Sequence, residues 1–142
     1  MSASAEVLEK LRATRARVQE QLINVTEEQM VLQVPGRVPR NVRAMFYLLV
    51  SHEAEHTVHL MKTLAALGVV QTEAQLILRL LQRSRGELEG LLLGLSDEDL
   101  DREPAKGDWS PRKVLEHIIA DEEVFSQRIR DAIQQKSEGQ PA

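Results

Sequence analysis

The sequence follows one plan twice, first in "LINVTEEQMVLQVPGRVPRNV" at residues 22–42 and again in "LLLGLSDEDLDREPAKGDWSPRKV" at residues 91–114. Each stretch leaves an apolar helical pattern, passes a Thr or Ser followed by acidic residues, crosses a proline loop and ends in Pro-Arg-x-Val. This internal repeat predicts two helical hairpins, each with a short acidic turn between two long helices. Because an amphipathic hairpin cannot bury its apolar face alone, the fold is predicted to be an all-α four-helix bundle of two pseudo-repeated hairpins.

Helical periodicity on either side of the first stretch predicts the first two long helices. The first is expected over residues 5–22. The second is expected to start at Pro39 or Arg40 and to end at Leu67, where Gly68 provides a left-handed stop.

The second half of the chain carries clear helix-start signals. Thr72 begins the third helix with a capping box, in which the Thr72 hydroxyl and the Gln75 side chain each satisfy a free backbone N–H, and this helix is expected to fade near Gly94. The fourth helix opens with Ser110 as N-cap, before a proline at the first helical position, and continues to about Gln134.

Composition narrows the class of protein. A chain of 142 residues predicts one bundle domain over residues 1–135, followed by a polar, disordered tail over residues 136–142. The absence of cysteine excludes disulfides and thiolate metal sites. A net charge of −4 with interspersed signs argues against nucleic acid as a partner. Without a signal sequence or a bilayer-spanning apolar run, the expected location is cytoplasmic, with no membrane partner.

Three of the four histidines lie in "SHEAEHTVH", residues 51–59. The i, i+4 spacing sets His52 and His56 side by side near the apolar stripe of the second helix, where both could reach one ion at about 2.0–2.1 Å. His59 is expected on the shoulder of the stripe, beside His52. The alternative is that one imidazole bonds a carbonyl or carboxylate across the bundle and the other stays solvated.

The fourth helix adds "VLEHIIADEEVF", residues 114–125. Glu122 projects into its apolar stripe, and it is either a group at or behind a metal or half of a buried ion pair. His117 falls at the margin of the stripe with Asp121 one turn further on. Its alternative role is that of a boundary histidine bonded to water or to Asp121.

Three kinds of metal site could use these residues. A zinc protease would use His52 and His56 as ligands and Glu53 as general base, but the chain lacks the third ligand of the longer motif and a strand to hold a peptide. A di-iron bundle would need a second Glu-x-x-His, and the fourth helix has "VLEH" in its place. The third kind is a mononuclear site in which His52 and His56 meet His117, with water completing the shell.

At these residues the chain resembles the DinB-like (YfiT-like) superfamily of four-helix bundles. "GDWSPRKVLEHIIADEE" is similar to its signature, in which Trp-Ser opens a helix, a His follows eight residues after the Trp and an acidic residue comes about five later; Trp109, Ser110, His117 and Glu122 match. "HEAEHTVHLMKTLAALGVV" resembles the family's His-x-x-x-His helix, which ends at a Gly.

The order of these two helices is reversed relative to the usual order in the family. In the first half of the chain, Met45 holds the place equivalent to His117. In the second half, Val124 and Arg128 hold the places equivalent to the two histidines of the His-x-x-x-His motif. A pseudo-twofold bundle can still bring one half-site from each hairpin together, as if the chain were permuted.

The resemblance implies a divalent metal, zinc or nickel, held by His52, His56 and His117. It also implies a small-molecule substrate and the transfer of a low-molecular-weight thiol, or hydrolysis at the same ion. Asp121, Glu122 and, more remotely, Glu53 are the candidates for acid–base roles. The competing interpretation is a non-catalytic bundle, dimerising or stress-related, without a functional metal site.

The third helix is rich in leucine. Leu76, Leu78, Leu80 and Leu81 are interpreted either as the surface of a homodimer or as the most buried face of the bundle.

Overall fold

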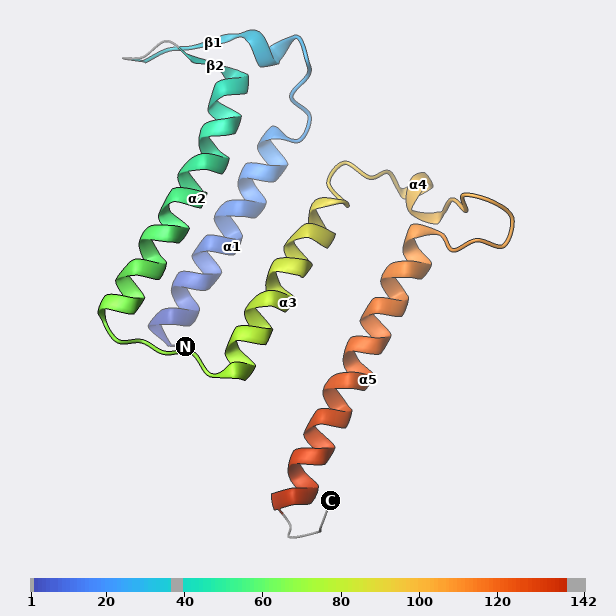
Figure 1. Ribbon diagram of the computed structural model, residues 1–142. Helices are drawn as coiled ribbons and strands as arrows, with labels where there is room; N and C mark the ends of the chain where they lie inside the picture. Colours follow the sequence, from blue (N-terminus) through green and yellow to red (C-terminus); the bar gives the residue numbers. More distant parts are fainter. Residues whose placement is uncertain (1, 37–39, 138–142) are drawn as a thin grey trace. The chain divides into compact units, whose positions relative to one another are not determined.

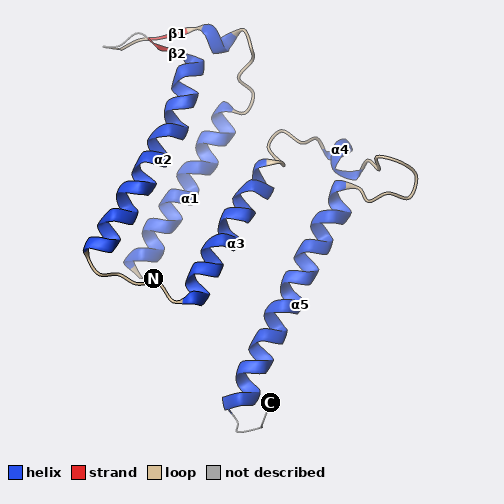
Figure 2. Cartoon of the chain, in the orientation of Figure 1, coloured by secondary structure: helices blue, strands red, loops and turns tan. Residues whose placement is uncertain are grey.

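The computed structural model describes residues 2–36 and 40–137 and divides the chain into two compact units, Met1–Gly90 and Leu91–Ala142 (Figure 1). The described residues are mostly helical, with five α-helices, one 3-10 helix and one short ribbon of two strands (Figure 2). The all-α class expected from the sequence is confirmed. The single domain over residues 1–135 stays a prediction.

The first unit begins with a helical hairpin and continues into a third helix. In chain order its elements are α1 (Ala3–Leu22), η1 (Gln29–Val31), β1 (Gln33–Val34), β2 (Arg40–Asn41), α2 (Val42–Ala66) and α3 (Glu73–Gly90). The Ser2 hydroxyl caps α1 by accepting a hydrogen bond from the Ala5 amide at 3.3 Å. The chain reverses direction between α1 and α2, so these two helices run antiparallel (Figure 1).

The start of α2 differs from the expected one. Arg40 lies in β2 and pairs with Val34, while Asn41 pairs with Gln33 in the antiparallel ribbon. The Val42 amide donates to the Leu32 carbonyl at 2.9 Å, which holds the chain extended up to the helix. The predicted start at Arg40 is therefore wrong, because ribbon pairing outweighs the local helical pattern; the alternative start, Pro39, lies outside the described residues.

The end of α2 and the start of α3 follow the sequence signals. Gly68 has φ of +68° directly after the C-cap Leu67, so the predicted left-handed stop is confirmed. The Thr72 amide donates to Gln75 Oε1 at 2.9 Å and the Gln75 amide donates to Thr72 Oγ1 at 3.3 Å, which is the predicted capping box. The α3 helix ends at Gly90, before the expected Gly94, whose φ of +75° lies in the turn that follows.

The second unit contains the short helix α4 (Asp97–Asp101) and the long helix α5 (Pro111–Ser137). As predicted, Ser110 caps α5: its hydroxyl accepts a hydrogen bond from the Lys113 amide at 3.3 Å, and Pro111 is the first helical residue. The helix runs past the expected Gln134 and includes the first two residues of the predicted tail. The remaining tail residues, 138–142, lie outside the described chain.

Burial is partial in both units, and no described residue is fully buried. Half-buried apolar side chains gather where each short helix meets the start of a long one. In the first unit they are Leu22, Val25, Met30, Val34, Val42, Met45 and Phe46; in the second they are Leu100, Pro111, Leu115 and Ile118. Packing at these junctions sets the direction in which each long helix continues from the preceding connection. None of the described helices combines the length and the apolar character that a membrane span requires.

Candidate functional site

The first group of candidate ligands lies on one face of α2. The imidazole rings of His52 and His56 have their centroids 4.5 Å apart at an interplanar angle of 65°. His59 lies beside His56, with 5.7 Å between the ring centroids. All three histidines are exposed. Helical spacing thus places two adjacent imidazoles in the arrangement from which a pair of ring nitrogens can approach one ion.

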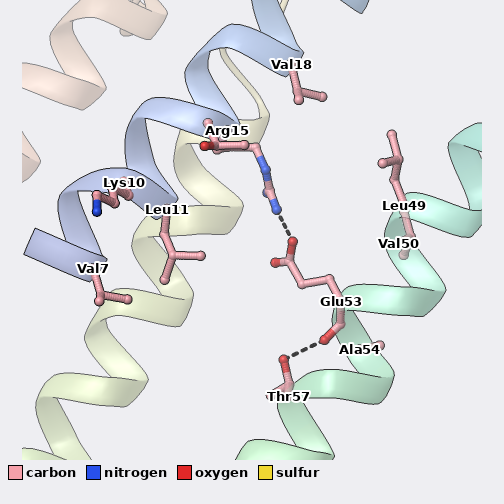
Figure 3. Close-up of a pocket in the computed structure, with 11 residues that line it drawn as sticks. Val7, Lys10, Leu11, Arg15, Val18, Leu49, Val50, Glu53, Ala54 and Thr57 are labelled. Atoms are coloured by element: carbon pink, nitrogen blue, oxygen red, sulfur yellow. Dashed lines mark hydrogen bonds and ion pairs between the residues drawn. The ribbon is translucent and has the colours of Figure 1, made fainter. Parts of the chain in front are cut away.

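Glu53 points to a different side of α2. Its carboxylate forms an ion pair and a hydrogen bond with Arg15 of α1 across an open groove between the two helices (Figure 3). The Glu53 carbonyl accepts a hydrogen bond from Thr57 Oγ1 at 2.8 Å. The groove is otherwise mostly apolar, and α1 and α2 line it with Val7, Leu11, Val18, Leu49, Val50 and Ala54. Glu53 is therefore engaged in joining α1 to α2, and its role as a general base stays a prediction.

The second group lies at the start of α5. The rings of Trp109 and His117 form an edge-to-face pair, with centroids 5.1 Å apart and an interplanar angle of 75°. The Lys113 ammonium nitrogen lies 5.2 Å from the centroid of the same indole. On the other side of His117, its Nε2 is 3.4 Å from Asp121 Oδ2. Lys113, His117 and Asp121 are spaced i, i+4, so they form one row along the helix, which we call the α5 row.

Asp121 and Glu122 differ in their surroundings. Asp121 is half-buried and beside His117, whereas Glu122 is exposed in the second unit taken by itself. A carboxylate beside an imidazole can accept its N–H and fix the orientation of the ring. Of the two adjacent acidic candidates, Asp121 is the one that the structure places next to a candidate ligand.

A tight ion pair holds the start of α5 to α4. Arg112 donates from Nε to Asp101 Oδ1 at 2.5 Å and from Nη2 to Asp101 Oδ2 at 3.1 Å. Hydrogen bonds from Arg112 lower the pKa of the Asp101 carboxyl, and the same contact raises the pKa of Arg112. This bidentate contact orients the first turn of α5, from which the α5 row follows.

The structure therefore brings the candidate ligands together in two groups, His52 with His56 in the first unit and His117 with Asp121 in the second. Within either unit, the described residues contain no cluster of three His, Asp or Glu side chains suited to holding a metal ion. The donor types fit a divalent transition metal, since imidazole nitrogen suits both zinc and nickel.

Sequence reasoning missed Arg15 as the partner of Glu53. The two residues belong to different helices and are 38 positions apart, and local periodicity says nothing of the register between helices. Their opposite charges are the only signal, and many other pairs along these helices share it. The contact between Trp109 and His117 was not predicted, and the spacing of the Trp-Ser motif is the one sequence signal that relates the two residues.

A family model that describes the DinB superfamily matches residues 80–142, a little under half of the chain. This segment contains α4, α5 and the Trp-Ser motif with His117 and Glu122. Neither the comparison with curated proteins nor that with solved structures gives a match for this chain.

The described residues define an all-α protein in which a Trp-Ser pair directly precedes the helix that carries His117. The match over residues 80–142 supports DinB-like membership. The match begins after the helix that carries His52 and His56, and the reversed order of the two motif helices stays a prediction.

Proposed function

We propose that this protein is a metal-dependent enzyme of the DinB superfamily in which His52, His56 and His117 hold one divalent ion, zinc or nickel. The observation that carries the proposal is the pair of adjacent imidazoles on α2, with ring centroids 4.5 Å apart. The family match over residues 80–142 supports His117 as the third ligand, because it covers the motif in which this histidine lies.

The chemistry of the three donors supports an open catalytic site. Three neutral imidazoles leave a fourth position on a tetrahedral ion for a substrate or water, whereas a purely structural site is closed by four protein ligands. When bound, such an ion lowers the pKa of a thiol that coordinates it, and so favours the thiolate at neutral pH. The protein's own contribution would be to orient the rings: Asp121 Oδ2, 3.4 Å from His117 Nε2, is placed where it could accept the ring N–H and hold the side chain.

The reaction we propose is transfer of a low-molecular-weight thiol to an electrophilic carbon. The thiol sulfur forms a bond to that carbon, the leaving group departs with its electron pair, and the thiol proton passes to a carboxylate. Asp121 and Glu122 are the candidates for this proton, and Glu53 is less suited because Arg15 engages its carboxylate. Hydrolysis at the same position is the second reaction that this donor set would support.

The test is the metal content of protein purified without a histidine tag. We expect stoichiometric zinc or nickel in the wild type. The His52→Ala/His56→Ala double variant should lose more than about 100-fold in affinity, since even partners behind a metal ligand change affinity by about 10- to 100-fold. His59→Ala is the matched control, because it removes a histidine from the same face of α2 and leaves the proposed pair intact.

Metal-free protein whose melting is unchanged by a chelator would instead identify a non-catalytic bundle, the competing function. Metal-replete protein should next be screened for thiol conjugation to electrophiles and for hydrolysis of esters and amides. Activity lost in His117→Ala supports the three-histidine site, and activity retained in that variant contradicts it.

A further inference from the structure

Trp109 has a position that helix capping alone does not require. It lies one residue before the N-cap Ser110, where an apolar residue ordinarily packs against the fourth helical residue, here Val114. The structure places the indole beside the His117 ring, three residues beyond Val114, in an edge-to-face arrangement with ring centroids 5.1 Å apart and an interplanar angle of 75°. Trp109 is also 45 % exposed, so burial of the indole is incomplete in the second unit.

Two further contacts limit how His117 can turn. The ammonium group of Lys113, one turn before His117 in the α5 row, lies 5.2 Å from the Trp109 ring centroid. This cation–π contact favours the position of the indole beside the first turn of α5. Asp121, one turn after His117, is 3.4 Å from Nε2. The imidazole is thus flanked by an aromatic ring on the N-terminal side and a carboxylate on the C-terminal side.

An exposed histidine on a helix ordinarily samples several side-chain rotamers, and a metal that binds it must select one. An edge-to-face contact with an aromatic ring favours a single arrangement of the two rings and is worth more than the area it buries. A ligand held in one orientation before the ion arrives loses less conformational entropy on binding.

We propose that Trp109 is a positioning residue for His117: its indole holds the imidazole in the orientation used to bind a divalent cation. This proposal rests on the function proposed above and goes beyond it by assigning a role to the Trp of the Trp-Ser motif. Trp109 does not touch the ion, and its effect passes through the His117 ring.

The experiment compares Zn²⁺ affinity by calorimetry in the full-length wild type and in Trp109→Leu and Trp109→Phe. We expect Trp109→Leu to bind about two- to ten-fold more weakly, the range that corresponds to releasing one immobilised side chain. Trp109→Phe keeps an aromatic edge and should recover most of the wild-type affinity. In the metal-free proteins, the ring-proton NMR signals of His117 should shift in Trp109→Leu, because the ring current of the indole is lost.

Ser110→Ala is the matched control for a merely structural effect. It removes the cap hydrogen bond to Lys113 and weakens the start of α5, yet it leaves the indole and the imidazole in place. We expect a lower melting temperature with Zn²⁺ affinity within about two-fold of the wild type, well under the tenfold that 1.4 kcal/mol represents. Equal losses of affinity in Ser110→Ala and Trp109→Leu would overturn the proposal in favour of simple destabilisation of the helix.

His117→Ala separates failure of this proposal from failure of the proposed function. If His117→Ala abolishes Zn²⁺ binding while Trp109→Leu binds like the wild type, the positioning role is overturned and the metal site stands. If the wild type binds no Zn²⁺, or His117→Ala binds it unchanged, the three-histidine site and the positioning role fall together. Since Trp109 is the only tryptophan in the chain, quenching of its emission by Ni²⁺ in the wild type but not in His117→Ala gives an independent check on the same ion.

Discussion

The two long helices that follow Pro-Arg-x-Val, α2 and α5, start at different places in that motif. In the second unit, Pro111 and Arg112 form the first turn of α5, and Ser110 caps it. In the first unit, Arg40 belongs to the ribbon, and α2 begins only after Asn41, whose Oδ1 accepts from the Ala44 amide at 2.8 Å. The difference teaches that one motif can start a helix at two places: ribbon pairing keeps the first copy extended up to Asn41, whereas in the second copy a serine, where the first has valine, caps the helix before the proline.

The same comparison extends to how each connection is held. In the second unit, Arg112 grips Asp101 through two hydrogen bonds. In the first unit, Arg43 pairs with Glu27 at 3.4 Å, and the backbone hydrogen bonds of the ribbon hold the residues directly before the helix. One half thus relies on a bidentate ion pair and the other on backbone hydrogen bonds.

Giving the second motif the cap arrangement of the first should have the largest effect on the free energy of unfolding. The double variant Ser110→Val/Lys113→Asn gives the second motif the cap arrangement of the first. We expect α5 to start at Val114 and the protein to lose roughly 1–2 kcal/mol of unfolding free energy, because a first turn and its cap are given up. Backbone NMR chemical shifts of Arg112 and residue 113 measure the change, and shifts that stay helical would show that the cap does not set the start.

Removing the existing cap of α2 should have a smaller effect. Asn41→Ala leaves the Ala44 amide without its side-chain acceptor and should lower the free energy of unfolding by about 1 kcal/mol. Lys113→Ala, at the equivalent place in the second motif, should change it by less than about 0.5 kcal/mol because Lys113 caps nothing. Chemical denaturation of both variants makes the comparison, and equal losses would contradict it.

The smallest expected effect concerns pH. Because hydrogen bonds from Arg112 hold the pKa of Asp101 below its value in the unfolded chain, this contact contributes stability above the unfolded pKa and loses it as the pH falls through the folded pKa. Asp101→Asn should therefore flatten the acid side of the stability curve measured by denaturation at successive pH values. Glu27→Gln, which removes the charge that pairs with Arg43 at 3.4 Å, should change the stability curve less than Asp101→Asn does. A larger change in Glu27→Gln would show that the first unit depends on this ion pair.

Local signals in the sequence were sufficient to place most helix boundaries. The capping box of Thr72 and Gln75, the cap at Ser110 and the stop at Gly68 all involve residues within a few positions of each other. The start of α2 was missed because the decisive hydrogen bond joins Val42 to Leu32 across a ribbon of only two residues per strand. Such a short strand leaves no alternating pattern to detect.

In the candidate site, too, contacts within one helix were predictable from the sequence and contacts between helices were not. The spacing of His52 and His56, and of His117 and Asp121, correctly predicted neighbours because both pairs lie one turn apart on a single helix. His59 was expected beside His52, but its ring lies near that of His56, since the i, i+3 neighbour is closer than the one two turns away. The partnership of Arg15 with Glu53 depends on how α1 lies against α2, and no pattern within either helix determines it.

Several helix starts of this protein are capped by hydrogen bonds between residues only three positions apart. The side chains of Thr26 and Gln29, and those of Thr72 and Gln75, each accept a hydrogen bond from the other residue's amide, and the Ser96 hydroxyl accepts one from the Asp99 amide, all across three residues. Contacts at such short sequence separation form early and cost little loop-closure entropy. Each helix can therefore nucleate as soon as its own first turn is available, and the slow step in folding should be the search by which preformed helices find one another.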